Sequence, residues 1–62
     1  MGAKLAKAFD IAKEAGGTQV QMRLAMKSGM SQQKAESESD SPENISKMEA
    51  ALKEVTGKDV KL

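Results

Sequence analysis

The stretch SPENISKMEAALKEVTG, residues 41–57, decides the fold because it carries signals for both ends of a helix and an apolar face between them. Ser41 is a favoured N-cap residue, Pro42 suits the first helical position because its missing N–H is not needed there, and Gly57 ends the helix. At about 100° per residue, one arc gathers the apolar side chains Ile45, Met48, Ala51, Leu52 and Val55. The sequence therefore predicts an amphipathic helix over 42–56 that packs on the rest of the chain.

Glycines divide the preceding chain into further helical patterns. Residues 4–15 place apolar and small side chains on one face and end at Gly16 and Gly17. Thr18 can cap a helix over 18–28, which ends before Gly29, and Ser31 can cap a short helix over 31–36. Because the 18–28 helix has apolar side chains on two sides, we expect it to be the central helix, buried between two neighbours.

Residues 36–41 read ESESDS and separate the short helix from the last one. Without apolar side chains, and with serines that compete for backbone hydrogen bonds, this segment is interpreted as a solvated acidic linker. The tail KDVKL is too short for an independent strand, so Val60 or Leu62 is expected to fold back onto the core or to meet a partner chain. The predicted fold is all-α, a compact bundle of three to four short helices with a C-terminal tail, in one domain over 1–62.

Length and composition limit how such a bundle is stabilised. A chain of 62 residues has a thin core, and the absence of cysteine and histidine removes disulfides and the common zinc sites. Self-association is the remaining means of stabilisation, so a homo-oligomer is expected. No apolar run reaches the length of a membrane span, and the lack of cysteine fits a reducing compartment. We therefore expect a cytoplasmic protein that does not bind membranes.

Catalysis has little support in this sequence. Without histidine and cysteine, only carboxylates, lysines and hydroxyls remain, and so short a chain can hardly enclose a catalytic cleft. Gly16 and Gly17 lack the Gly-Lys-Ser/Thr that completes a phosphate-binding loop. The acidic run has the spacing that begins a calcium loop, but Ser41 and Lys47 stand where glycine and glutamate belong. The prediction is a protein that is not an enzyme and has no cofactor or metal.

Three methionines, Met22, Met26 and Met30, are spaced i, i+4, i+8 and form a predicted stripe. Methionine fills irregular gaps in cores, and it also suits adaptable binding surfaces. Core packing is the favoured interpretation, because so short a chain needs its apolar area, and in a homodimer the stripe could also pack across the two-fold axis. The leading hypothesis for function is a non-enzymatic protein–protein interaction module that self-associates, with the helices over 18–28 and 42–56 presenting the contact surfaces and the stripe as the candidate interaction surface.

Residues 21–35 resemble a helix-turn-helix motif through Leu24, Ala25, Gly29, Met30 and Ser31, which supply the apolar, small, turn, apolar and capping residues that such motifs use. The resemblance implies a small DNA-binding regulator, with nucleic-acid contacts from Arg23, Lys27, Gln32, Gln33 and Lys34.

Two observations place this second hypothesis behind the first. The recognition helix of such a motif needs an apolar anchor near position 38, which is Glu38 here. Glu36, Glu38 and Asp40 also put negative charge beside Lys34, where phosphates would have to approach. Charge is uneven along the whole chain, because residues 1–35 hold six basic and two acidic side chains and residues 36–62 hold four basic and seven acidic ones.

Overall fold

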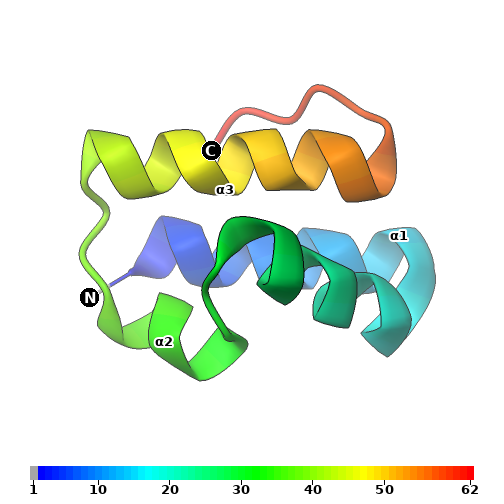
Figure 1. Ribbon diagram of the computed structural model, residues 1–62, viewed down its shortest axis with the longest axis horizontal. Helices are drawn as coiled ribbons and strands as arrows, with labels where there is room; N and C mark the ends of the chain where they lie inside the picture. The colour runs from blue at the N-terminus through cyan, green and yellow to red at the C-terminus, as the bar shows by residue number, and fades with distance from the viewer. Residues whose placement is uncertain (1) are drawn as a thin grey trace.

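The computed structural model describes residues 2–62 and has three helical segments, α1 (Ala3–Ser28), α2 (Gln32–Ser37) and α3 (Pro42–Thr56). α1 is bent back on itself, because Gly16 and Gly17 have non-helical backbone angles and Gly17 has a φ of 76°. Its first half (3–15) and second half (18–28) run antiparallel (Figure 1). The Gln21 Nε2–H group donates to the Phe9 carbonyl oxygen (2.9 Å) and ties the halves together. The predicted all-α bundle is confirmed.

Backbone geometry confirms the predicted helix over 42–56 and the predicted helix end before Gly29, whereas the short helix runs over Gln32–Ser37, one residue later than predicted. Ser41 Oγ accepts from the Asn44 N–H (3.3 Å) and caps α3, which begins at Pro42. The glycines that follow α1 and α3 adopt the left-handed conformation, with φ of 74° at Gly29 and 73° at Gly57. Each donates its N–H to a carbonyl four residues earlier, which satisfies one of the acceptors left free at a helix end.

α3 lies along both halves of α1 and closes the core (Figure 1). The fully buried large side chains come from both halves of α1 and from α3: Leu5, Phe9, Leu24, Met48 and Leu52. Within residues 2–62, every buried side-chain nitrogen and oxygen has a hydrogen-bond partner. The chain's own helices thus close this core, while Met22 and Met26 remain outside it.

The expectation that the 18–28 helix is buried on two sides is wrong. Leu24 and Ser28 are buried and Val20 is half-buried, but Met22 is 67% exposed and Met26 is 83% exposed. One side of the helix faces the core, and the side carrying these two methionines faces solvent. Methionine at this helical spacing therefore marks a surface here.

The acidic segment 36–41 is only partly a solvated linker. Glu36 and Ser37 belong to α2, and the Asp40 carboxylate reaches the start of α1. The Lys4 N–H donates to Asp40 Oδ2 and the Leu5 N–H to Asp40 Oδ1, both at 3.3 Å. Since the first turn of α1 has no acidic residue of its own, Asp40 provides the negative charge and the acceptors that this helix end requires.

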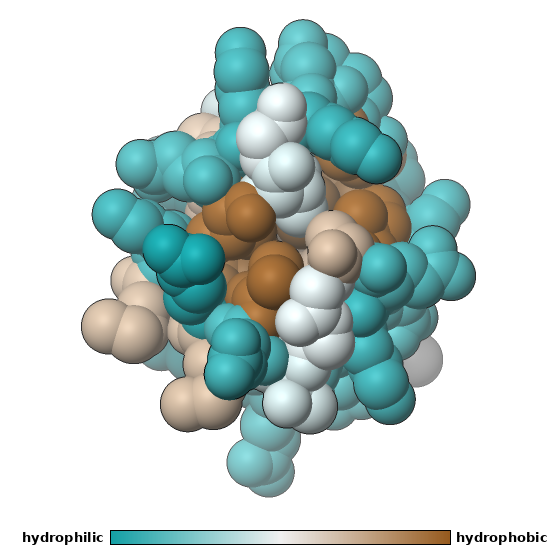
Figure 2. All heavy atoms as spheres, turned by 90° about the vertical axis from the view of Figure 1, so that its right-hand side faces the viewer, coloured by the Kyte–Doolittle hydropathy of each residue, from teal (hydrophilic) through white to brown (hydrophobic). Residues whose placement is uncertain are grey.

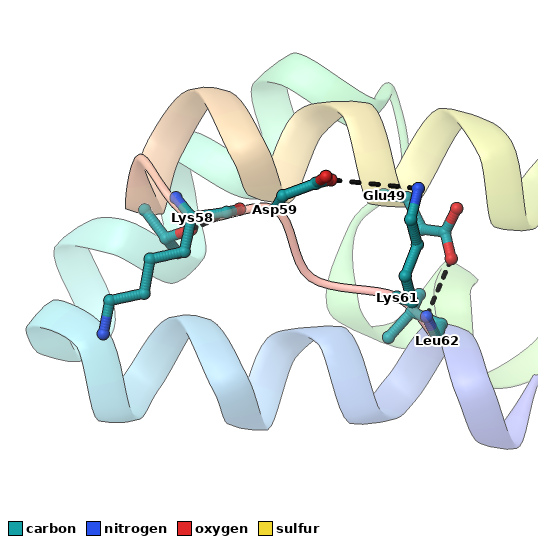
Figure 3. A network of polar contacts seen from close by, with 6 residues as sticks. Glu49, Lys58, Asp59, Lys61 and Leu62 are labelled. Atoms are coloured by element: carbon teal, nitrogen blue, oxygen red, sulfur yellow. Dashed lines mark hydrogen bonds and ion pairs between the residues drawn. The ribbon is translucent and has the colours of Figure 1, made fainter.

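The C-terminal tail folds back onto the bundle (Figure 3). The Leu62 N–H donates to Glu49 Oε2 of α3 (2.7 Å), while Val60 and Leu62 pack against the core. Where the tail leaves α3, apolar side chains lie amid hydrophilic ones at the end of the molecule (Figure 2). They line an open hollow of about 240 Å³ that includes Ile11 and Val60. Of the helices within residues 2–62, none has the length and apolar character needed to cross a bilayer.

Candidate functional site

The second half of α1 and α2 meet at a corner formed by Gly29. The left-handed backbone at Gly29 turns the chain, and Ser31 begins α2, with its Oγ accepting from the Lys34 N–H (3.2 Å). Leu24 before the corner and Met30 after it are buried, as is Ala35 in α2. These buried residues belong to one apolar core, which holds the two helices together at the corner.

Ser28 reinforces this corner from inside. It is the buried polar residue of the core, and its Oγ accepts from the Met30 N–H (3.3 Å). The same hydroxyl lies 3.4 Å from the Met30 carbonyl oxygen and 3.5 Å from that of Ala25, either of which can accept its proton. Sequence reasoning missed this residue, because a serine before a glycine gives no sign that its hydroxyl will be buried.

The far end of α2 is held by the N-terminal residues. The Gly2 N–H donates to the Glu36 carbonyl oxygen (3.2 Å). A Cβ on Gly2 would overlap the Ala35 carbonyl oxygen and come within 2.6 Å of that of Glu38, so only glycine fits here. α2 ends at Ser37, one residue short of the position where an apolar anchor was expected. Backbone contacts with Gly2 fix this end of α2.

The polar residues predicted to contact nucleic acid are all exposed. Gln32, Gln33 and Lys34 lie on α2, and Arg23 and Lys27 lie on the second half of α1. Between Ala15 and Ala35 the chain has these three basic side chains and no acidic one. Lys27 Nζ is 3.8 Å from Glu54 Oε1 of α3, and both side chains are more than half exposed. Such an exposed pair contributes little and leaves the lysine accessible to other anions.

The structure separates the three acidic residues that counted against DNA binding. Asp40 is half-buried and bound to the first turn of α1. Glu38 is half-buried beyond the end of α2, and its N–H donates to the Lys34 carbonyl oxygen. Glu36 alone is an exposed acidic side chain on α2 itself. Of the three, Asp40 is therefore bound to α1, and Glu36 remains exposed on α2 with Lys34.

A shallow hollow lies where the second half of α1 approaches α2. Its volume is about 290 Å³, and it is lined by Phe9, Thr18, Gln21, Met22, Ala25, Ser31 and Gln32. None of these side chains is charged, and most of the surface that they present to the hollow belongs to apolar atoms. The hollow thus joins one of the exposed methionines to the first residues of α2.

The predicted methionine stripe is not formed as one surface. Met22 and Met26 are exposed, whereas Met30 is 6% exposed and packs in the core. The helix ends at Ser28, so the turn at Gly29 carries Met30 off the helical spiral and into the corner. Met30 therefore does not belong to an exposed interaction surface.

Within the part of the chain that the structure describes, no three histidine, cysteine, aspartate or glutamate side chains come together as metal ligands. No known protein family matches the sequence, and neither a curated protein nor a solved structure shows detectable similarity to the chain. Any functional interpretation therefore rests on the residues of the corner and on the surface around it.

Proposed function

We propose that this chain is a helix-turn-helix module that binds duplex DNA, with α2 as the helix that enters the major groove. The observation that carries the proposal is the corner itself. The left-handed Gly29 turns the chain, and the buried Leu24 before the turn and Met30 after it hold α2 against the core. Gln32 and Gln33 of α2 remain exposed. On this geometry we place DNA binding ahead of the self-association that the sequence favours.

The exposed side chains suit the two kinds of contact that such a module makes. A glutamine amide donates and accepts at once, which matches the N6 and N7 groups of adenine in the major groove. Arg23, Lys27 and Lys34 carry the positive charge that phosphates require. α2 has six residues and is about 9 Å long, which is enough because recognition helices read bases through their N-terminal residues.

The test begins with selection of bound sequences from a pool of random DNA duplexes at low ionic strength, followed by fluorescence anisotropy on the selected duplex. We expect enrichment of a short motif that contains adenine. Gln33→Ala should relax selectivity at one position, losing roughly 1–3 kcal/mol of discrimination. Gln32→Ala provides the same test at the neighbouring residue.

The control is Lys58→Gln, because Lys58 follows the end of α3, at the opposite end of the molecule from α2 (Figure 1). This exposed residue should leave both affinity and selected motif unchanged. A pool that shows no enrichment, or a motif that survives the loss of both glutamines, would contradict the proposal.

The exposed pair Met22 and Met26 favours a second function, protein binding. Contacts with DNA phosphates and sugars give no reason to expose two apolar side chains to solvent. Flexible methionine side chains suit a surface that binds another protein. The methionines are assigned to protein binding alone, and Gln32 and Gln33 to DNA binding alone, so the two functions can be tested separately.

A further inference from the structure

Met22 and Met26 are the large apolar side chains that stand out most from the surface of residues 2–62, at 67% and 83% exposure. They are four residues apart on the second half of α1, so they lie on one face of that helix. Met22 also lines the hollow of about 290 Å³ at the corner, where Phe9 and Ala25 add apolar surface. Together these residues form an apolar strip with room beside it for a side chain from outside.

The charged side chains on the second half of α1, which carries this strip, are all positive. Arg23 and Lys27 each follow one of the methionines, and no acidic residue occurs from 15 to 35. Lys27 has an acidic neighbour in Glu54 of α3, but this contact is long (3.8 Å) and exposed. A surface with apolar centre and basic border is complementary to an apolar segment bordered by carboxylates.

A second copy of this chain fits the strip less well. A two-fold axis through the methionines would bring Arg23 and Lys27 of one copy toward the same residues of its partner, which is unfavourable. The acidic helix α3 of another copy would offer the right charge, but its apolar residues Met48 and Leu52 are already buried in its own core. The occupant must therefore supply both carboxylates and free apolar side chains.

We propose that the strip of Met22 and Met26, with the adjoining hollow, binds an acidic amphipathic segment of another protein. Apolar side chains of that segment cover the methionines and enter the hollow beside Ala25, and its carboxylates pair with Arg23 and Lys27. An amphipathic helix with apolar residues at i, i+3, i+4 and i+7 has the required pattern. This inference does not depend on DNA binding.

The test uses full-length protein labelled with ¹³C in its methionine methyl groups and a synthetic helical peptide that has leucines at that spacing and glutamates on its flanks. We expect the methyl signals of Met22 and Met26 to shift on titration, while that of the fully buried Met48 stays in place. One matched peptide replaces the glutamates by lysines, and another replaces the leucines by serines. Neither should bind comparably.

Protein variants complete the test. Met22→Ser combined with Met26→Ser should weaken peptide binding by about tenfold or more and leave the amide spectrum of the fold intact, because both side chains are exposed. Arg23→Gln should also weaken binding, whereas Lys58→Gln should not.

Unshifted methyl signals, equal binding of the lysine-bearing peptide, or full binding by the methionine variant would each overturn the inference. A doubling of mass without peptide that the methionine variant abolishes would overturn it in favour of a second copy. Peptide binding by a protein that binds no duplex would sink the DNA-binding proposal alone, and duplex binding by a protein that binds no peptide would sink this one alone.

Discussion

Gly29 and Gly57 provide a matched pair for testing the role of the corner. Their φ values are 74° and 73°, and a Cβ built on either glycine meets nothing within 4 Å. Alanine at either position is therefore opposed by backbone conformation alone and by no neighbouring atom. The two substitutions should affect folding equally, but only Gly29 lies between the proposed DNA-binding helices.

The expected size of the effect follows from two opposing terms. An L-residue in the left-handed region is disfavoured by roughly 1–2 kcal/mol. Replacing glycine by alanine also restricts the unfolded chain, which returns about 0.4–1 kcal/mol. At the middle of these two ranges the net loss is about 1 kcal/mol, which should lower the melting temperature of both Gly29→Ala and Gly57→Ala by about 4–8 °C in a domain of this size.

Thermal unfolding followed by circular dichroism measures the first effect, and DNA binding by anisotropy measures the second. Gly29→Ala should weaken binding at a temperature where both variants are folded, while Gly57→Ala binds normally. Gly29→Asn should be less destabilised than Gly29→Ala, since asparagine tolerates the left-handed conformation. If the alanine variant at either glycine melted at or above the temperature of the unmodified protein, the assigned backbone conformation would be refuted there.

Three further substitutions probe contacts that shape the fold. Asp40→Ala removes the acceptors at the start of α1 and should lower stability by about 1 kcal/mol in urea unfolding, whereas the exposed Glu36→Gln should change it by less than about 0.5 kcal/mol. Equal effects of the two would contradict the capping role. Leu52→Ala empties a fully buried position and should cost about 2–5 kcal/mol, so a melting curve shifted by only a few degrees would count against the assigned core. Glu49→Ala removes the acceptor of the Leu62 N–H, and hydrogen exchange at the Leu62 amide should then accelerate; an unchanged rate would show that this contact does not hold the tail.

Helix boundaries could be predicted because capping depends on residues a few positions apart. Ser41 accepts from Asn44, and Ser31 accepts from Lys34, both over three residues. Gly29 and Gly57 act through their own backbone angles. Each of these signals is local, so the sequence contains all the information that the structure uses there.

The contacts of Asp40 and Gly2 could not be predicted, because they join distant parts of the chain. Asp40 binds the Lys4 N–H across 36 positions, and Gly2 binds the Glu36 carbonyl across a similar distance. An acidic run without apolar residues is typical of a solvated linker, and only the packing of α1 beside it gives Asp40 a helix N-terminus to cap. The sequence pattern identifies an acidic segment, but it does not indicate that the start of α1 is the binding partner of Asp40.

The candidate site shows the same division. Exposure of Gln32, Gln33 and Lys34 followed from the motif, as did the turn at Gly29. The burial of Met30 could not be predicted from the motif, because residues spaced i, i+4, i+8 share a face only if one helix continues through all of them. Past Ser28 the chain turns, and the third methionine becomes part of the core.

The most direct test of the central claim is the salt dependence of duplex binding. Three phosphate contacts, from Arg23, Lys27 and Lys34, predict that the logarithm of the binding constant falls with the logarithm of salt concentration with a slope of about −2.7. Lys34→Gln should reduce the slope by about 0.9, and Lys58→Gln should leave it unchanged. Absence of duplex binding at about 50 mM salt, or a slope that Lys34→Gln does not alter, would contradict the account.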